Sequence, residues 1–166
     1  VEKIFIELRM SLGDGAGLLI VSDRLEELPQ SLKELGVSFV RGSLREEGVA
    51  EKANVGESQG VIVLPDSQDS NDTEVYATAS FLKNLFPTQV SRVLSMIENA
   101  SSVELFRKAG LRYIWGDGLP DRVMTQDLNQ PGIGEVVGQL LSYRTGCELY
   151  LRKHRSTGHP LSGLQI

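Results

Sequence analysis

The stretch GLLIVSD at residues 17–23 decides how the rest of the chain is interpreted, because it predicts a buried β-strand that ends in an acid. A glycine-rich run, LGDGAG at 12–17, comes directly before it. In nucleotide-binding α/β units, a glycine-rich loop follows the first strand and an acidic residue ends the second. The interpretation of the chain therefore depends on whether this strand is the first or the second of such a unit.

The segment before the glycines answers this question. Apolar residues recur at helical spacing in VEKIFIELRMSL, at positions 1, 4, 5, 8 and 12, and this predicts an amphipathic helix that the glycines end. A strand that follows a helix is the second of its unit, so the first strand and its glycine loop are not in this sequence. Gly13, Gly15 and Gly17 precede a strand, and Gly132 and Gly134 follow none, whereas a phosphate loop follows a strand and opens a helix. We therefore interpret both glycine clusters as turns of the chain.

Short apolar strands and helices alternate along the remaining sequence. Strands are predicted at 18–21, 37–40, 61–64, 92–97 and 112–115, with a possible last strand at 147–153. Helices are predicted at 28–36, 43–53, 71–86, 101–110, 119–128 and 132–142, with a break at Pro131. Ser43 with Glu46, and Ser101 with Glu104, have the spacing of capping boxes. The pattern predicts an α/β fold, a Rossmann-like parallel sheet with helices on both faces.

The strand that precedes the first helix would lie at the centre of such a sheet, between the second and fourth strands. Its absence leaves the main-chain groups of both neighbours unpaired, at about 1–3 kcal/mol for each buried group. We therefore expect the first strand to come from elsewhere, from a separate chain or from another part of a longer polypeptide. Without its glycine loop, we expect the present chain to bind nucleotides poorly.

The overall composition narrows the class of protein. The 166 residues carry a net charge of −5, which argues against a nucleic-acid partner. No apolar run approaches the roughly 20 residues of a membrane span. The single cysteine, Cys147, excludes an internal disulfide and favours a cytoplasmic location. The sequence shows no catalytic constellation, so we predict a non-enzyme.

Three stretches together resemble one family. They are VRGSLREEGVAEKANVGESQGVIVLPDSQDSNDTEVYATASFLKNL at 40–85, RVLSMIENASSVELFRKAGLRYIWGD at 92–117 and DRVMTQDLNQPGIGEVVGQLLSYRTGCELYL at 121–151. Their order and spacing are similar to those of RCK domains, the regulators of K⁺ conductance, also called Trk-type nucleotide-binding domains. The likeness covers residues 1–153. It implies a Rossmann-like lobe at 1–130 and a crossover helix with a following strand at 131–153 that contacts a partner; 154–166 is read as a flexible tail.

The resemblance also implies a role and partners. RCK domains form dimers and gating rings beneath a potassium pore, on the inner face of the cell membrane. Nucleotides such as NAD, ADP or ATP, or divalent cations such as Ca²⁺, bind one conformation of the ring more tightly than the other. They thereby change the fraction of pores that are open. The sequence alone leaves the ligand, and the choice between channel and transporter, open.

Candidate ligand residues follow the ends of the predicted strands. Asp23 is placed to accept hydrogen bonds from ribose hydroxyls, or else to cap the next helix. Arg24 is a candidate phosphate contact or a solvated surface residue. The remaining candidates for a cofactor site are Gly42, Ser43, Leu64, Pro65, Asp66, Asp69 and Asn71. Ser43 stands where the family usually has an aspartate.

A second group of candidates concerns a metal. Asp66, Asp69 and Asp72 fall within a short acidic loop, and hard cations take carboxylate oxygens. The same acids would also complement the dipole of the next helix, with Ser70 or Asn71 as its cap. The resemblance adds Glu98, which stands where calcium-gated relatives carry one of two acids. Met96 stands at the place of the other, which argues against calcium control by this route. The metal candidates are therefore Asp69, Asp72 and Glu98.

Two other functions compete with a regulatory domain. A fragment of an NAD-dependent dehydrogenase would need a phosphate loop and a catalytic domain. A receiver-like signalling domain would need an aspartate at the end of a central strand, where Gly42 and Leu64 stand. Trp115, Met124 and Tyr143 are expected in the core or at a dimer interface.

Overall fold

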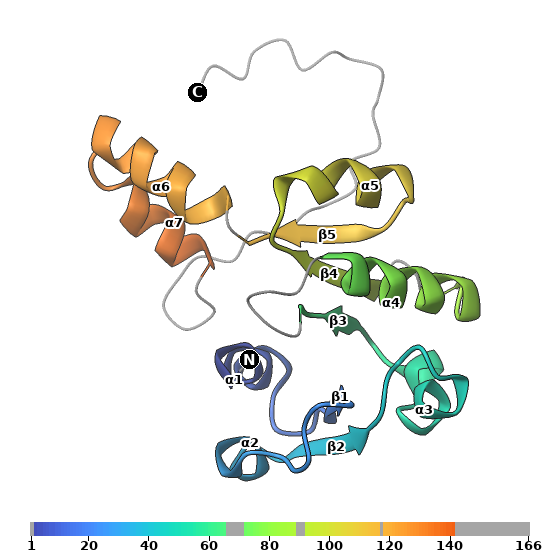
Figure 1. The fold of residues 1–166 in the computed structure, drawn as a ribbon. Helices are drawn as coiled ribbons and strands as arrows, with labels where there is room; N and C mark the ends of the chain where they lie inside the picture. Colours follow the sequence, from blue (N-terminus) through green and yellow to red (C-terminus); the bar gives the residue numbers. More distant parts are fainter. Residues whose placement is uncertain (1, 66–71, 89–91, 117, 142–166) are drawn as a thin grey trace, which may run out of the picture.

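The computed structural model describes residues 2–65, 72–88, 92–116 and 118–141 (Figure 1). In chain order its elements are α1 (Glu2–Leu12), β1 (Leu18–Ser22), α2 (Gln30–Glu34), β2 (Val37–Arg41), α3 (Glu47–Lys52), the 3₁₀ turn η1 (Val55–Glu57), β3 (Val61–Val63), α4 (Asp72–Leu85), β4 (Val93–Ile97), the 3₁₀ turn η3 (Ala100–Ser102), α5 (Val103–Lys108), β5 (Arg112–Trp115), α6 (Gly118–Asn129) and α7 (Ile133–Leu141). The predicted alternation of helices and strands is confirmed.

The strands form two parallel sheets. β1 pairs with β2, Leu18 opposite Val37, and β4 lies between β3 and β5, with Ile62 opposite Leu94. The predicted α/β class with parallel strands and flanking helices is thereby confirmed. Among the described strands, β1 and β3 are not paired with each other, and each lies at an edge of its own sheet.

Each sheet has its own apolar core. The larger core lies between the β3–β5 sheet and helices α4 and α5, and its completely buried residues include Leu82, Ile97 and Phe106. The ring of Phe106 meets that of Tyr76 edge-on, with 5.4 Å between centroids. The smaller core joins α1 and α2 to the β1–β2 sheet and consists of Phe5, Leu18, Leu28, Leu32 and Val37. The helices are therefore held by burial against the sheets, since most of them are too short to be stable alone.

The end of α1 is fixed by Arg9. Its guanidinium donates to the carbonyl oxygens of Ala16 and Leu35, each at 2.8 Å. Gly13 ends the helix with a φ of 78°, a left-handed conformation that glycine adopts without steric cost. The predicted stop after the first helix is therefore confirmed, and Arg9 joins it to the end of α2.

Both predicted capping boxes are wrong. α3 begins at Glu47, and the Ser43 hydroxyl instead accepts a hydrogen bond from the N–H of Arg45, which forms a turn before the helix. At the second site, a 3₁₀ turn runs into α5, and Ser102, the residue before the helix, makes no side-chain cap. Serine side chains bond nearby backbone groups in several local patterns, so spacing alone did not identify the helix start.

The helical segment after β5 contains the predicted break. α6 and α7 are separated at Gln130–Gly132 and pack on each other. Trp115 is partly buried beneath Arg122, 5.1 Å from the guanidinium carbon to the ring centroid. Met124, expected in a core or an interface, is 66% exposed within this chain, so a place in the core of the chain is excluded. Tyr143 and the predicted strand at 147–153 lie outside the described residues, as does the tail at 154–166.

Candidate functional site

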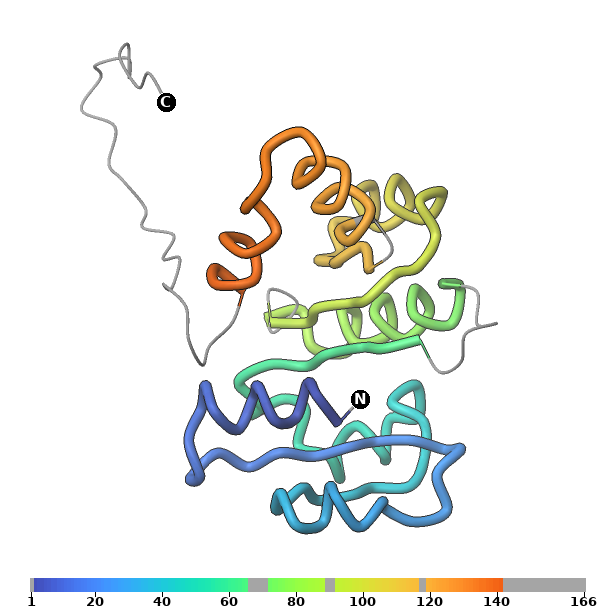
Figure 2. Tube along the Cα trace, turned by 90° about the vertical axis from the view of Figure 1, so that its left-hand side faces the viewer, coloured from blue at the N-terminus to red at the C-terminus, as the bar shows by residue number. Residues whose placement is uncertain are grey.

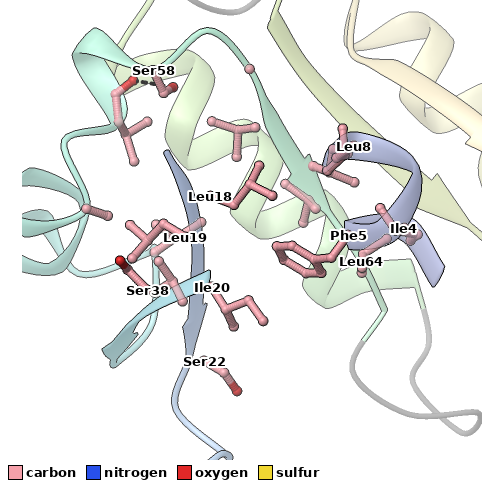
Figure 3. A pocket seen from close by; sticks show the side chains of 18 of the residues that line it. Ile4, Phe5, Leu8, Leu18, Leu19, Ile20, Ser22, Ser38, Ser58 and Leu64 are labelled. Carbon is pink, nitrogen blue, oxygen red and sulfur yellow. Dashed lines mark hydrogen bonds between the residues drawn. The ribbon is translucent and has the colours of Figure 1, made fainter. Parts of the chain in front are cut away.

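One large cleft lies at the inner edges of the two sheets. Its volume is about 1930 Å³, and its walls come from α1, β1, β3, α4 and the turns after the strands. All of the predicted cofactor residues that the structure describes line it, namely Asp23, Arg24, Gly42, Ser43, Leu64 and Pro65. They meet because the carboxyl ends of parallel strands lie at the same edge. Figure 3 shows Leu18 and Ile20 of β1 on the side of the strand toward Phe5 and Leu64.

The carboxyl end of β1 is shaped by a serine. The hydroxyl of Ser22 accepts hydrogen bonds from the N–H groups of Arg24 and Leu25, at 3.2 and 3.3 Å. This turn leaves the side chain of Asp23 exposed at the mouth of the cleft. The alternative role of Asp23 as a helix cap is wrong, because α2 begins only at Gln30. Its carboxylate can therefore accept hydrogen bonds from a ligand.

Arg24 connects the two sides of the cleft. Its guanidinium lies 3.8 Å from the carboxylate of Glu74 in the first turn of α4, and both side chains are about half exposed. An exposed pair of this kind stabilises a fold by about 0–1 kcal/mol. A phosphate at this position would therefore have to displace at least this ion pair.

The carboxyl end of β2 requires a glycine. Gly42 has a φ of 142°, and a Cβ added there would come within 2.7 Å of a Val49 methyl group. Its N–H donates to the carbonyl of Ser22 at 3.0 Å, which extends the β1–β2 pairing to the cleft. Gly42 and the half-buried Ser43 thus line the cleft at the carboxyl end of β2.

The first turns of α4 add residues that the sequence reasoning did not propose. Glu74, Val75 and Thr78 line the cleft opposite the end of β1. A usable signal existed, since a helix that follows a strand in a parallel α/β unit begins at the carboxyl edge of the sheet. The structure brings this helix start next to Leu64 and Pro65 in the cleft wall.

The metal candidates do not meet in one place among the described residues. Asp72 is buried, and its carboxylate accepts hydrogen bonds from the N–H groups of Glu98 and Asn99, at 2.9 and 3.0 Å. Burial by itself would raise the pKa of Asp72, but hydrogen bonds from Glu98, Ser102 and Asn99 together hold this pKa below its ordinary value. The oxygens of Asp72 are therefore engaged with the polypeptide.

The other metal candidates are more dispersed. Glu98 is half-buried, and its carbonyl oxygen accepts the indole N–H of Trp115 at 3.1 Å. The ranges that the structure describes contain no group of three or more histidine, cysteine, aspartate or glutamate side chains arranged to hold a metal. Asp66, Asp69 and Asn71 lie outside these ranges.

Comparison with known families agrees with this geometry. The family model described as the TrkA-N domain matches residues 10–116, which is more than half of the chain and includes every cleft-lining strand. No match to a curated protein was found. Among the helices of the described residues, none has the length and apolar character needed to cross a bilayer.

Proposed function

Because the chain belongs to the TrkA-N domain family, whose members are regulatory NAD-binding domains of potassium transport systems, we propose that it controls a potassium channel by binding a nucleotide. The nucleotide binds in the cleft at the carboxyl ends of β1, β2 and β3. The single observation that carries this proposal is the convergence of six predicted ligand residues on that cleft, from three strands distant in sequence.

The chemistry of the cleft supports a nucleotide. The exposed carboxylate of Asp23 is an acceptor for ribose hydroxyls at the end of the second strand. The Ser43 hydroxyl would contact the edge of the base, and the main chain at Leu64 and Pro65, which line the same cleft, would contact the ligand as well. NAD, ADP and ATP share this ribose and base, so the three are the ligands to compare.

A nucleotide can regulate a channel only if the domains assemble differently with the nucleotide bound than without it. α6 and α7 expose Met124, Leu128, Val136 and Leu141, which are between 55% and 86% exposed within this chain. We assign these helices to contacts with a second RCK domain, in a dimer or a gating ring on the cytoplasmic side of a potassium pore. A ligand shifts such a ring only through its different affinities for the two arrangements.

A divalent cation is a second ligand for this domain. The sequence places Asp69, Asp72 and Glu98 near the loop between β3 and α4 and the end of β4. Since the Asp72 oxygens already accept two amide hydrogen bonds, a cation that used them would have to displace these bonds. Nucleotide regulation is therefore the principal proposal, and Ca²⁺ and Mg²⁺ belong in the same binding experiment.

The test is a titration of isotope-labelled protein with NAD, ADP, ATP, Ca²⁺ and Mg²⁺, followed by amide NMR, which detects millimolar binding. We expect a nucleotide to shift the amides of Asp23, Gly42, Ser43 and Leu64. Asp23→Asn should weaken binding by roughly three- to tenfold, the effect of about one hydrogen bond. Asp14→Asn, an exposed acid before β1, is the matched control and should leave binding unchanged.

Two results would overturn the proposal. One is the absence of nucleotide-dependent shifts at these amides, or shifts confined to another surface. The other is transfer of hydride between NADH and a substrate, which would favour the competing dehydrogenase reading. Sedimentation with and without the nucleotide tests the assembly step separately from the binding step.

A further inference from the structure

One face of the β3–β5 sheet is the core face. Val93 and Ile97 of β4 are buried there beneath α4 and α5, and the ring of Tyr113 on β5 meets Phe106 of α5 edge-on, with 6.1 Å between centroids. Figures 1 and 2 show α4 on one side of β3 and α1 and α7 on the other. Successive strand residues point to opposite faces, so the neighbours of these core residues lie on the second face.

The second face of this sheet is apolar, and we call its residues Ile62, Leu94, Met96 and Ile114 the open face. The strand register brings them together, because Ile62 is opposite Leu94 and Met96 is opposite Ile114. Ile62 and Ile114 are 40% and 55% exposed, so the described helices do not cover them. Parallel sheets are ordinarily covered on both faces. The open face therefore calls for an apolar occupant.

The amino edge of the open face carries positive charge. Arg92 precedes β4 and Arg112 opens β5, and both line the large cleft. Arg92 donates to the carbonyl oxygen of Ser58 at 3.3 Å, and this bond holds its guanidinium at the edge. Lys52 and Glu57 also line the cleft, just before β3, and their charges offset each other. An occupant that complements this edge carries a carboxylate as well as apolar side chains.

A groove connects the open face with the end of α7. The groove has a volume of about 390 Å³ and lies between one flank of α1 and Leu141, the last residue of α7. Ile4 and Leu8 of α1 line this groove, and both also line the large cleft together with Ile62 and Leu94. The chain that follows α7 therefore starts beside the open face.

The sequence after Leu141 contains a segment of matching chemistry. Residues 147–151, CELYL, are apolar except for Glu148, the single acid after α7. Five residues, 142–146, connect this segment to α7, and five extended residues span up to about 17 Å. Three paired strands are about 10 Å wide, so the connection is long enough to bring the segment onto the sheet.

We propose that residues 147–151 pack on the open face of their own chain and place Glu148 at the edge formed by Arg92 and Arg112. The apolar side chains of the segment cover Ile62, Leu94, Met96 and Ile114, and the sheet is then buried on both faces. The nucleotide candidates lie at the opposite, carboxyl ends of the strands. This inference therefore stands whether or not a nucleotide binds.

Cys147 makes the proposal measurable in the full chain without a label. It is the only cysteine of the protein, so the rate of its reaction with an aromatic disulfide reagent reports on that position alone. A covered thiol reacts only when the segment opens. We expect native Cys147 to react roughly tenfold or more slowly than Cys147 in the chain unfolded by guanidinium.

Two substitutions address the two sides of the contact. Leu149→Asp changes the segment and leaves every described residue intact, and Ile114→Asp changes the open face at an exposed position. We expect each to raise the rate of thiol modification by roughly tenfold. Leu105→Asp is the matched control, because Leu105 is 47% exposed on α5, away from the open face. This control should leave the rate unchanged.

A charge reversal tests the edge. Glu148→Lys places a cation beside Arg92 and Arg112, and we expect it to raise the rate of thiol modification by roughly threefold, as for an exposed ion pair. Arg112→Glu, added to Glu148→Lys, should bring the rate back toward that of the native chain. No recovery in the double variant would overturn the assignment of Glu148 to this edge.

Three other results would overturn the proposal. One is a native rate equal to that of the unfolded chain, which would mean that Cys147 is not covered. Another is a rate that Leu149→Asp raises but Ile114→Asp does not, which would place the segment on another surface. The third is a rate that falls as the protein concentration rises, which would assign the segment to a second copy. All measurements are made without nucleotide, so they are separate from the test of the proposed function.

Discussion

The carboxylate of Asp72 accepts a hydrogen bond from the backbone N–H of Glu98, 2.9 Å away, and thereby joins the start of α4 to the loop after β4. A second bond from the N–H of Asn99, at 3.0 Å, uses the other oxygen. Asp72 is 3% exposed, so these bonds lie where water does not compete with them. The two residues proposed as metal ligands are thus related as acceptor and amide donor.

Replacement of this acid tests its structural role. Asp72→Asn keeps the size of the side chain but turns one of its two acceptors into a donor, which then faces an amide N–H. We expect the free energy of unfolding to fall by about 1–3 kcal/mol, measured by urea denaturation. Asp14→Asn is the exposed control and should change stability by less than about 0.5 kcal/mol. Equal stability of both variants would contradict the role of Asp72.

The pH dependence of stability follows from the same carboxylate. The pKa of Asp72 is lower in the folded protein than its ordinary value of 3.8, so its contribution is complete above that value. The contribution is lost as the pH falls through the folded-state pKa. We expect the stability of the wild type to decrease more steeply than that of Asp72→Asn as the pH falls from about 5 to about 2. Parallel curves for the two proteins would show that Asp72 is not responsible.

Gly42 is expected to tolerate no side chain. Gly42→Ala places a methyl group within 2.7 Å of Val49 at a φ of 142°, so stability should fall by about 1–3 kcal/mol. Gly48→Ala, in α3 with no atom within 4 Å of its added Cβ, is the matched control. We expect this control to be neutral or to gain up to about 1 kcal/mol from helix propensity. Thermal unfolding of the two variants compares them directly, and a neutral Gly42→Ala would refute the close approach to Val49.

Arg9 is predicted to hold α1 against the β1–β2 sheet. Arg9→Met keeps much of the aliphatic stem but removes the donors to Ala16 and Leu35, and we expect a loss of about 1–3 kcal/mol. Hydrogen exchange in α1 and β1 should accelerate more than in β4. Arg45→Met, at an exposed position, is the control. An unchanged exchange rate in α1 would indicate that apolar burial of Phe5 alone fixes the helix.

This chain by itself is predicted to bind nucleotides weakly. Among the described residues, no strand is followed by the G-x-G-x-x-G spacing of a phosphate loop, because the turn from β5 to α6 has Gly116 and Gly118 but Asp121 at the third glycine position. We expect ADP to bind more weakly than about 1 mM by calorimetry. Submillimolar binding would show that the cleft holds phosphates by other groups.

Much of the fold was accessible from periodicity. Apolar runs and helical spacing identified every described strand and helix, because burial of apolar faces is a local property of the pattern. The boundaries were less accurate: Ser43 and Ser101 both matched a capping box, and neither begins its helix. The hydroxyl of Ser43 accepts a hydrogen bond from the N–H of Arg45, two residues away. The choice between such local hydrogen bonds depends on how the following segment packs.

The order of helices and strands and the placement of ligand candidates at strand ends were determined by the sequence itself, because both are fixed by spacing along the chain. Only the tertiary structure decided that the Asp72 carboxylate accepts a hydrogen bond from the main chain at Glu98, that Arg24 pairs with Glu74, and that α4 supplies a wall of the cleft. These relationships join residues far apart in sequence. They depend on the relative positions of packed elements, which no local pattern encodes.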